Sequence, residues 1–178
     1  MRNDIEKVFF TEEMIRNRVK ELGAQLSEDY KGKKPLLIGV LKGSFIFLAD
    51  LARHMDTICD IEFIAVSSYG AGTESSGKVK ISKALDADIE NRHLIIVEDI
   101  LDTGLTLEYL RKYLMSLKPA SVKICAFLDK PSRRKVAISA DYVGYECVDA
   151  FYVGYGLDYA GHYRNLPFIG SLKKEIYT

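Results

Sequence analysis

One stretch of the sequence, residues 93–117, constrains the fold more than any other. Residues 94–97 form a continuous apolar run with β-branched side chains, which is typical of a strand buried on both faces of a parallel sheet. Two adjacent carboxylates, Glu98 and Asp99, follow directly, so we expect the strand to end there. Leucines then recur at helical spacing, at positions 107, 110, 114 and 117, which predicts a helix from about residue 104.

The turn between this strand and this helix, residues 102–106, has the composition of an anion-binding loop. The start of a helix offers free backbone N–H groups and the positive end of the helix dipole. Gly104 permits a tight turn and a close approach of the backbone to a ligand. Thr103 and Thr106 would either donate hydroxyl hydrogen bonds to an anion or cap the helix, and spacing alone favours capping.

The acid pair points to a ligand rather than to a cap. Glu98 and Asp99 lie at the carboxyl end of a predicted buried strand, where open α/β sheets bind ligands. Two neighbouring carboxylates repel each other, so a cation or sugar hydroxyl groups would stabilise them. Phosphate donors on one side and carboxylates on the other suit a ribose 5-phosphate with a magnesium ion nearby.

Two lysines follow other predicted strands in the same way. Residues 36–41 and 122–128 are apolar runs that predict buried strands, and Lys42 and Lys130 come just after them. Such a lysine could neutralise an anion or donate to a ligand oxygen, although each one alone is more often a solvated loop residue. The basic run at 132–135 is expected to be solvated surface.

The remaining elements complete an α/β pattern. Thr11 followed by acids predicts a helix start, and an apolar stripe continues that helix to about residue 30. A second helix is expected at 45–53, and strands are expected at 58–67, 79–82 and 141–146. Alternating strands and helices predict a parallel central sheet flanked by helices.

Composition bounds the class of protein. A chain of 178 residues is long enough for one domain with a full core, and its formal net charge of zero argues against a nucleic-acid or membrane surface. The three cysteines, Cys59, Cys125 and Cys147, have no metal-ligand spacing, so we expect reduced thiols in a cytoplasmic protein. Early acidic residues argue against a signal peptide, and no apolar run has membrane-spanning length.

A long, small and polar loop is expected at residues 68–78, with three glycines. Loops of this kind are often lids over an active site. Residues 72–78 also fit most of a nucleotide-binding G-x-x-x-x-G-K motif. Position 79 is Val rather than the Ser or Thr that would hold magnesium, so we reject that interpretation.

The central stretch also carries a resemblance to a known family. Residues 97–106 read Val97-Glu98-Asp99-Ile100-Leu101-Asp102-Thr103-Gly104-Leu105-Thr106. This run resembles the signature of the type I phosphoribosyltransferases, and the likeness to their hypoxanthine (6-oxopurine) branch extends over most of the chain. The resemblance implies one phosphoribosyltransferase domain over residues 1–178, with a core at about 30–145. A small hood would combine the N-terminal segment with residues 146–178.

The resemblance implies a purine salvage enzyme. It would transfer the 5-phosphoribosyl group from phosphoribosyl diphosphate (PRPP) to N9 of hypoxanthine or guanine, with Mg²⁺ as cofactor and pyrophosphate as the second product. Members of the family form homodimers or homotetramers. No nucleic-acid or membrane partner is expected.

The resemblance also assigns roles to residues. The sugar phosphate would be held by Glu98, Asp99, Asp102, Thr103, Gly104, Leu105 and Thr106, with Asp102 as general base at purine N7. Pyrophosphate would be held by Lys42, Gly43 and Arg164, and the Leu41–Lys42 peptide bond can be cis in relatives. Ser68 and Tyr69 would begin the lid. The purine would be bound by Lys130 at O6, by Phe151 through stacking and by the backbone of Tyr152, with Asp158 nearby. Magnesium would be held by Glu98 and Asp99, and a second magnesium ion by Asp158.

Three alternatives stay open at this point. Asp102 could cap its own loop instead of acting as a base, since Asp is common in such turns. The chain could be a PRPP-binding regulator that binds nucleic acid, although its zero net charge argues against this. It could also transfer ribose phosphate to xanthine or to a pyrimidine, because a fold alone does not determine the substrate.

Overall fold

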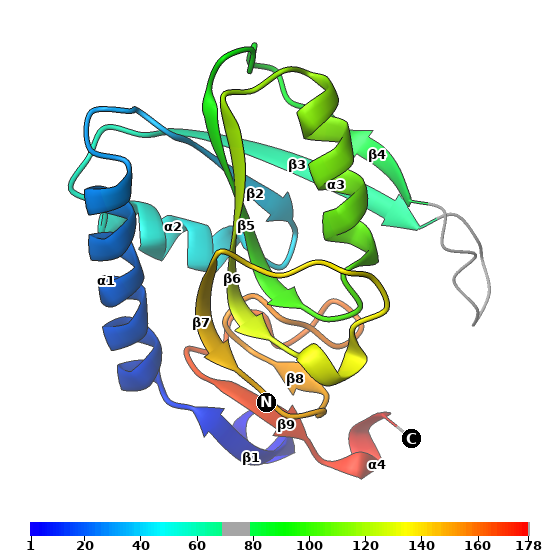
Figure 1. The fold of residues 1–178 in the computed structure, drawn as a ribbon. Helices are drawn as coiled ribbons and strands as arrows, with labels where there is room; N and C mark the ends of the chain where they lie inside the picture. The colour runs from blue at the N-terminus through cyan, green and yellow to red at the C-terminus, as the bar shows by residue number, and fades with distance from the viewer. Residues whose placement is uncertain (69–78, 178) are drawn as a thin grey trace.

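The computed structural model describes residues 1–68 and 79–177 (Figure 1). Its elements, in chain order, are η1 (Arg2–Asp4), β1 (Ile5–Phe10), α1 (Glu12–Asp29), β2 (Leu36–Leu41), α2 (Phe45–Arg53), β3 (Asp60–Ser68), β4 (Val79–Lys83), β5 (His93–Leu101), α3 (Leu105–Ser116), β6 (Ser121–Asp129), η2 (Pro131–Arg133), β7 (Tyr142–Glu146), β8 (Tyr152–Val153), β9 (Ile169–Leu172) and α4 (Lys174–Tyr177).

The central sheet confirms the predicted α/β class. Its strands lie in the order β4-β3-β2-β5-β6-β7. All neighbouring strands pair in parallel except β3 and β4, which are antiparallel, so β4 forms an antiparallel edge. A parallel sheet must be covered on both faces, because its strands carry apolar side chains on both sides.

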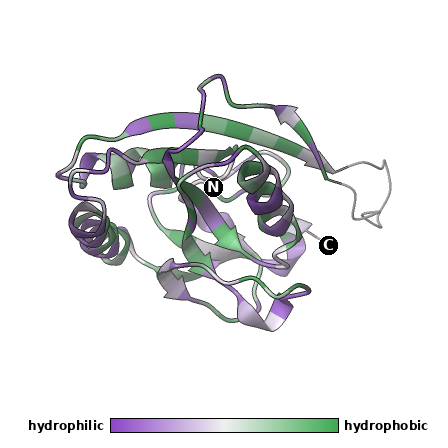
Figure 2. Cartoon of the chain, turned by 45° about the horizontal axis from the view of Figure 1, so that its top comes forward, coloured by the Kyte–Doolittle hydropathy of each residue, from purple (hydrophilic) through white to green (hydrophobic). Residues whose placement is uncertain are grey.

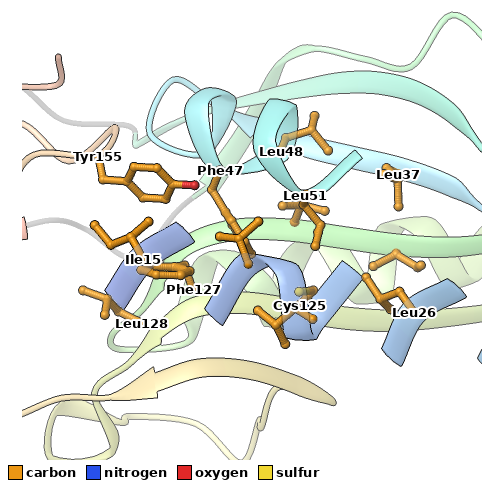
Figure 3. Close-up of a cluster of buried hydrophobic side chains, with 14 of the residues drawn as sticks. Ile15, Leu26, Leu37, Phe47, Leu48, Leu51, Cys125, Phe127, Leu128 and Tyr155 are labelled. Carbon is orange, nitrogen blue, oxygen red and sulfur yellow. The ribbon is translucent and has the colours of Figure 1, made fainter. Parts of the chain in front are cut away.

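Helices cover the two faces of the sheet, with α1 and α2 on one side and α3 on the other (Figure 1). Successive residues of β5 alternate between them. Ile95 and Val97 pack with the helices α1 and α2, whereas Leu94 and Ile96 pack with α3. Figure 3 shows the first of these clusters, in which aromatic Phe127 lies among side chains from both helices.

Hydropathy follows this layering. The strands of the central sheet are mainly hydrophobic, and hydrophilic residues gather on the outer faces of the helices (Figure 2). The predicted start of α1 is confirmed, since Oγ1 of Thr11 accepts a hydrogen bond from the backbone N–H of Met14 at 3.2 Å. None of the helices within the described ranges is long and apolar enough to cross a membrane.

Strand β5 corrects one prediction. The strand continues to Leu101, whereas we expected it to end where Glu98 begins. Its pairing with β2 stops at Val97, but its pairing with β6 continues to the pair of Leu101 with Asp129. The two carboxylates therefore stand on a strand that still has a hydrogen-bonded neighbour on one side, which holds them more firmly than a loop would.

A second, smaller sheet combines the two ends of the chain. Strands β1, β9 and β8 pair antiparallel in that order. The sheet lies below the carboxyl ends of the central strands in Figure 1. This sheet draws on the segments expected to form the hood, although the bounds given for core and hood stay a prediction.

Candidate functional site

The acid pair on β5 is the centre of the site. Glu98 is only 7% exposed and Asp99 is partly buried. Each carboxylate accepts a hydrogen bond from the backbone N–H of the next residue: Glu98 from Asp99 at 3.2 Å, and Asp99 from Ile100 at 2.7 Å. Neither carboxylate takes part in an ion pair with any residue that the structure describes. Burial raises the pKa of both carboxyl groups, and the charge of Asp99 adds to the effect on Glu98.

The loop after β2 packs closely against Asp99. A Cβ atom on Gly43 would lie 1.7 Å from Oδ2 of Asp99, so only glycine fits there. A Cβ atom on Gly156 would in turn lie 2.0 Å from the carbonyl oxygen of Gly43. The peptide bond between Leu41 and Lys42 is cis, and the side chain of Lys42 is exposed. The backbone of the predicted pyrophosphate loop therefore lies directly beside Asp99.

A pocket of about 260 Å³ opens between the acid pair and the start of α3. It is lined by Val40, Glu98, Ile100, Leu101, Asp102, Thr103, Gly104, Thr106 and Leu107. Gly104 is the N-cap residue of α3 and has a positive φ of 83°, a backbone conformation that favours glycine. The first N–H groups of a helix have no partner within the helix, so they are available to an anion in this pocket.

Of the capping that spacing favours for the threonines, the structure shows one weak hydrogen bond, to Thr103. No side chain caps α3 in the N-cap position, because that position is Gly104. The nearest hydroxyl, Oγ1 of Thr103, lies at a long 3.5 Å from the N–H of Leu105. A hydrogen bond of this length is weak, so the N–H groups at the start of α3 stay available to a ligand.

Asp102 has a buried and unsatisfied oxygen. Its Oδ1 atom is inaccessible to solvent and has no hydrogen-bond partner among the described residues. The nearest cation is Arg133, whose Nε lies 3.8 Å away. Loop capping, which we considered for Asp102, would need a hydrogen bond from the loop, and the side chain makes none with the part of the chain described here. A buried acceptor without a donor is unfavourable and is typical of a functional group that awaits a ligand.

Arg134 corrects the expected solvated surface at 132–135. Its side chain is only 16% exposed and forms an ion pair with Asp129 at the end of β6. It also donates to the carbonyl oxygens of Leu101, at 3.0 Å, and of Asp102. The guanidinium group therefore fixes the start of the phosphate loop. The only signal in the sequence was an acid at a strand end, five residues before an arginine.

The residues predicted to bind the purine, Lys130, Phe151 and Tyr152, follow β6 and β7 in the chain. Lys130 is 7% exposed, so it is not the solvated loop lysine that position alone suggests. Its Nζ donates to the carbonyl oxygen of Ala150 at 3.0 Å and lies 5.5 Å from the centroid of the Tyr152 ring. Phe151 keeps 46% of its surface exposed, and its ring stacks on that of Tyr177 at a centroid distance of 5.8 Å. An exposed aromatic face beside a buried ammonium group can accept a flat heterocycle.

Asp158 and Arg164 form an ion pair next to Gly156. Nη2 of Arg164 lies 2.7 Å from Oδ1 of Asp158, and its Nη1 donates to the carbonyl oxygen of Gly156 at 2.6 Å. The charge of Arg164 also acts to lower the pKa of Asp99, although burial outweighs it. Arg164 is therefore placed near Asp99 as well as Asp158. Of the expected lid residues, Ser68 ends β3 and Tyr69 lies outside the described residues.

No group of three potential metal-ligating side chains occurs within residues 1–68 and 79–177. Asp158, which the resemblance assigns to a second magnesium ion, therefore does not join Glu98 and Asp99 in one group of ligands. Mg²⁺ usually takes only one or two carboxylates from a protein and completes its shell with water and substrate oxygens. The donor set at β5 fits a magnesium ion that arrives with its substrate.

The fold and the site together define the class of protein. An open α/β sheet carries a helix N-terminus and a buried acid pair at the carboxyl end of a central strand, where such sheets bind ligands. A model of the phosphoribosyl transferase domain matches residues 11–160. The chain belongs to the phosphoribosyltransferase family.

Within this family the chain is similar to the hypoxanthine-guanine phosphoribosyltransferases. It is 56% identical to that enzyme of Bacillus subtilis, covering 99% of this chain and 98% of the relative. It is 54% identical to the enzyme of Streptococcus agalactiae, covering 100% and 99%. The crystal structure of a hypoxanthine phosphoribosyltransferase from Staphylococcus aureus superimposes with a TM-score of 0.97, at 53% identity, covering 100% and 97%.

Proposed function

We propose that this protein is a hypoxanthine-guanine phosphoribosyltransferase of purine salvage. It transfers the 5-phosphoribosyl group from PRPP to N9 of hypoxanthine or guanine and releases pyrophosphate. The observation that carries this proposal is the buried, unpaired acid pair of Glu98 and Asp99 next to the open N-terminus of α3. Similarity over the whole chain to enzymes with this name supports the choice of substrates.

The sugar phosphate is bound by the acids and the loop. The backbone N–H groups at the start of α3 hold the 5'-phosphate, with Thr103 and Thr106 as hydroxyl donors and Leu105 contributing its N–H. Glu98 and Asp99 accept hydrogen bonds from the ribose hydroxyl groups. Two buried carboxylates without partners are unfavourable in the free protein. Hydrogen bonds from the ribose hydroxyl groups offset this cost when the substrate binds, which explains why the protein keeps the acids there.

Magnesium fits the same site. Glu98 and Asp99 would hold the ion directly or through ribose oxygens, and Asp158 would hold a second one. When bound, the ion neutralises negative charge on the diphosphate and makes it a better leaving group. Gly43 and Arg164 hold the departing pyrophosphate, with Lys42 close by in the exposed loop.

Three groups of the protein bind the purine. Lys130 donates to O6, Phe151 stacks on the ring and the backbone of Tyr152 binds its edge. Asp102 removes the proton at N7 as N9 attacks C1', where positive charge develops as pyrophosphate leaves. No covalent intermediate is needed, so the rate depends on positioning and on charge stabilisation.

A 6-amino purine is rejected because Lys130 has no acceptor to meet. A buried donor that loses its acceptor costs about 1–3 kcal/mol, which corresponds to roughly fivefold to 150-fold in selectivity. Xanthine keeps the oxygen at position 6, so its rejection would need other groups.

The direct test is an assay of the purified protein with PRPP and MgCl₂. Hypoxanthine, guanine, xanthine, adenine and uracil are offered separately, and nucleotide and pyrophosphate formation are followed. We expect rapid conversion of hypoxanthine and guanine, and slow or no conversion of adenine and uracil. A protein that binds PRPP but converts no base would be a regulator, and the proposal would be wrong.

We further propose a cytoplasmic homo-oligomer, a dimer or a tetramer. Three free thiols support a reducing compartment. An apolar hollow of about 330 Å³ between α1 and α2 includes Ile46, and the neighbouring Phe45 is 43% exposed. Exposed apolar surface of this kind supports association. Light scattering after size-exclusion chromatography measures the mass, and a monomer at micromolar concentration would contradict this part.

A further inference from the structure

The buried ammonium group of Lys130 has two protein neighbours. Nζ donates to the carbonyl oxygen of Ala150 at 3.0 Å and lies 3.6 Å from Oδ1 of Asp149. An ammonium group has three N–H donors, and Ala150 takes one of them, whereas Asp149 pairs with the charge from beyond hydrogen-bond distance, so two donors are left for a ligand. Asp149 is the only acid that forms an ion pair with Lys130 within the described part of the chain.

Asp149 is also connected to Asp102. Nη1 of Arg133 lies 3.8 Å from Oδ2 of Asp149, and Nε of the same guanidinium group lies 3.8 Å from Oδ1 of Asp102. The four side chains therefore alternate in charge: Asp102, Arg133, Asp149 and Lys130. One end of this charge chain is the unsatisfied carboxylate oxygen, and the other end is the buried ammonium group.

From these contacts we infer that Asp149 is a positioning residue for purine recognition, and that Arg133 connects it to Asp102. Asp149 holds the ammonium group of Lys130 by charge attraction, so that one of its two free N–H groups faces O6 of the base. Arg133 lies between the two acids and keeps Asp102 in a fixed relation to Asp149. The donor at O6 and the base at N7 are thereby set at a constant separation. This inference rests on the proposed function and names two residues that take no direct part in it.

The burial of Lys130 explains why Asp149, although about half exposed itself, matters more than an acid that pairs with an exposed lysine. An ion pair between two exposed side chains contributes little to stability or binding. Lys130, however, is 7% exposed, and a buried ammonium group that loses its only acid becomes unfavourable and changes position. Asp149 and Arg133 themselves are about half exposed, so their replacement does not empty the core.

The test compares Asp149→Asn, Arg133→Gln and the double variant with the wild type. Asp86→Asn is the matched control, because Asp86 is an exposed acid that pairs with Lys83 at 3.4 Å and is not among the residues of the site. Initial rates give kcat and KM for hypoxanthine at saturating PRPP, KM for PRPP at saturating hypoxanthine, and the relative efficiency with adenine. Thermal unfolding of every variant checks that it is folded.

For Asp149→Asn we expect the KM for hypoxanthine to rise about tenfold, because one charge-assisted contact is lost. The KM for PRPP should change less than twofold. The preference for hypoxanthine over adenine falls. For Arg133→Gln we expect a smaller effect of the same kind. The double variant should lose less than the product of the two single effects, because the residues act in one charge chain.

Each contrary result has a distinct meaning. An active wild type whose Asp149→Asn variant keeps its KM for hypoxanthine would overturn the inference and leave the proposed function standing. Effects of the two substitutions that multiply would remove the connection through Arg133. If Asp149→Asn does not fold, Asp149→Glu and Arg133→Gln decide by the same KM comparison. A wild type inactive on every base would overturn the proposed function, and the inference with it.

Discussion

The α-carbon of Gly43 faces the carboxylate of Asp99 so closely that a methyl group there would lie 1.7 Å from Oδ2. The loop after β2 and the acid on β5 are thus fitted to each other without space for any side chain. Since Gly43 also contacts Gly156 through its carbonyl oxygen, three parts of the chain meet at this point.

Replacing Gly43 by alanine should therefore disturb catalysis through Asp99. Inserting a methyl group into a tightly packed position costs about 1–3 kcal/mol, and here the displaced group is a predicted ligand of ribose and magnesium. We expect kcat/KM for PRPP to fall at least about tenfold, the equivalent of 1.4 kcal/mol. Steady-state kinetics with varied PRPP measures this.

Gly32→Ala is the control for Gly43→Ala. Gly32 has a φ of 73°, so alanine is strained there, but no atom lies within 4 Å of the added methyl group. It should lower stability by about 1 kcal/mol and leave kcat/KM unchanged. Equal loss of activity in both variants would mean that Gly43 acts through stability alone.

Asp102→Asn should reduce turnover far more than PRPP binding. A general base contributes about 10²–10⁴-fold to a rate, and asparagine has the shape of aspartate without its basicity. Because Oδ1 accepts no hydrogen bond from the described residues and its ion pair with half-exposed Arg133 is long at 3.8 Å, the substitution should change the melting temperature little. Single-turnover rates and calorimetric titration of PRPP separate the two effects, and unchanged turnover would remove Asp102 as the base.

Arg134 should be important for stability rather than for chemistry. Truncation to alanine removes its ion pair with Asp129 and its hydrogen bonds to two carbonyl oxygens at the phosphate loop. Breaking a buried ion pair costs about 3–5 kcal/mol. Urea unfolding should show a loss of this size for Arg134→Ala.

The control for Arg134 is Arg53→Ala. Arg53 is 74% exposed and pairs with Asp50 on the surface of α2, so its removal should change stability by less than about 0.5 kcal/mol. A similar loss from both variants would contradict the role assigned to Arg134.

The acid pair should make stability depend on pH in an unusual direction. Because burial raises the pKa of Glu98, the folded protein still holds a proton at pH values where the unfolded chain has released it. The free energy of unfolding therefore falls as pH rises from the usual range of a carboxyl group toward the raised pKa. The N-terminal amine beside Asp4 and the Arg92 guanidinium beside Asp60 hold the pKa of those carboxyls below the usual range, so their effects lie at lower pH.

Glu98→Gln tests this dependence. The variant cannot ionise at position 98, so its stability relative to the wild type should increase as pH rises, and its binding of Mg²⁺ with PRPP should weaken. Urea unfolding at several pH values, without ligand, gives the comparison. A wild type and a variant with parallel pH profiles would show that Glu98 is not a source of the dependence.

Local features of the sequence predicted much of this structure. The bounds of α2, the Thr11 cap and the position of α3 follow from short-range patterns, because apolar spacing and capping residues act within a few positions. The extension of β5 past Glu98 could not be predicted, because it depends on pairing with β6. Hydrogen bonds to a distant strand leave no trace in local composition.

The same distinction applies to the site. The residues of the loop at 102–106 predicted an anion site, and the structure gives that loop a pocket at the start of α3, while anion binding itself stays a prediction. The contact of Gly43 with Asp99 joins residues that are far apart in the chain, so local patterns could not predict it. The burial of Lys130 and the ion pair of Arg134 could not be predicted either, because the local composition around both residues is that of a solvated loop. Family resemblance supplied roles for some of these, but neither Arg134 nor Asp149 was among them.

The stacking of Tyr177 on Phe151 gives a last prediction about the purine. The two rings lie 5.8 Å apart and 25° from parallel, and Tyr159 meets the edge of Phe151 at 5.8 Å. If α4 supports the ring that stacks on the base, Tyr177→Ala should free Phe151 to rotate. Aromatic pairs contribute about 0.5–1.5 kcal/mol, so the KM for hypoxanthine should rise roughly twofold to tenfold while the KM for PRPP stays constant.

Tyr177→Phe keeps the ring and removes the hydroxyl, so it should behave as the wild type. The comparison also separates two arrangements of the aromatic cluster. A ring that supports Phe151 from behind improves base binding, whereas a ring that occupies the place of the purine would compete with it. A fall in the KM for hypoxanthine in Tyr177→Ala would therefore contradict the supporting role, because removing a competitor is the only change that would make the base bind more tightly.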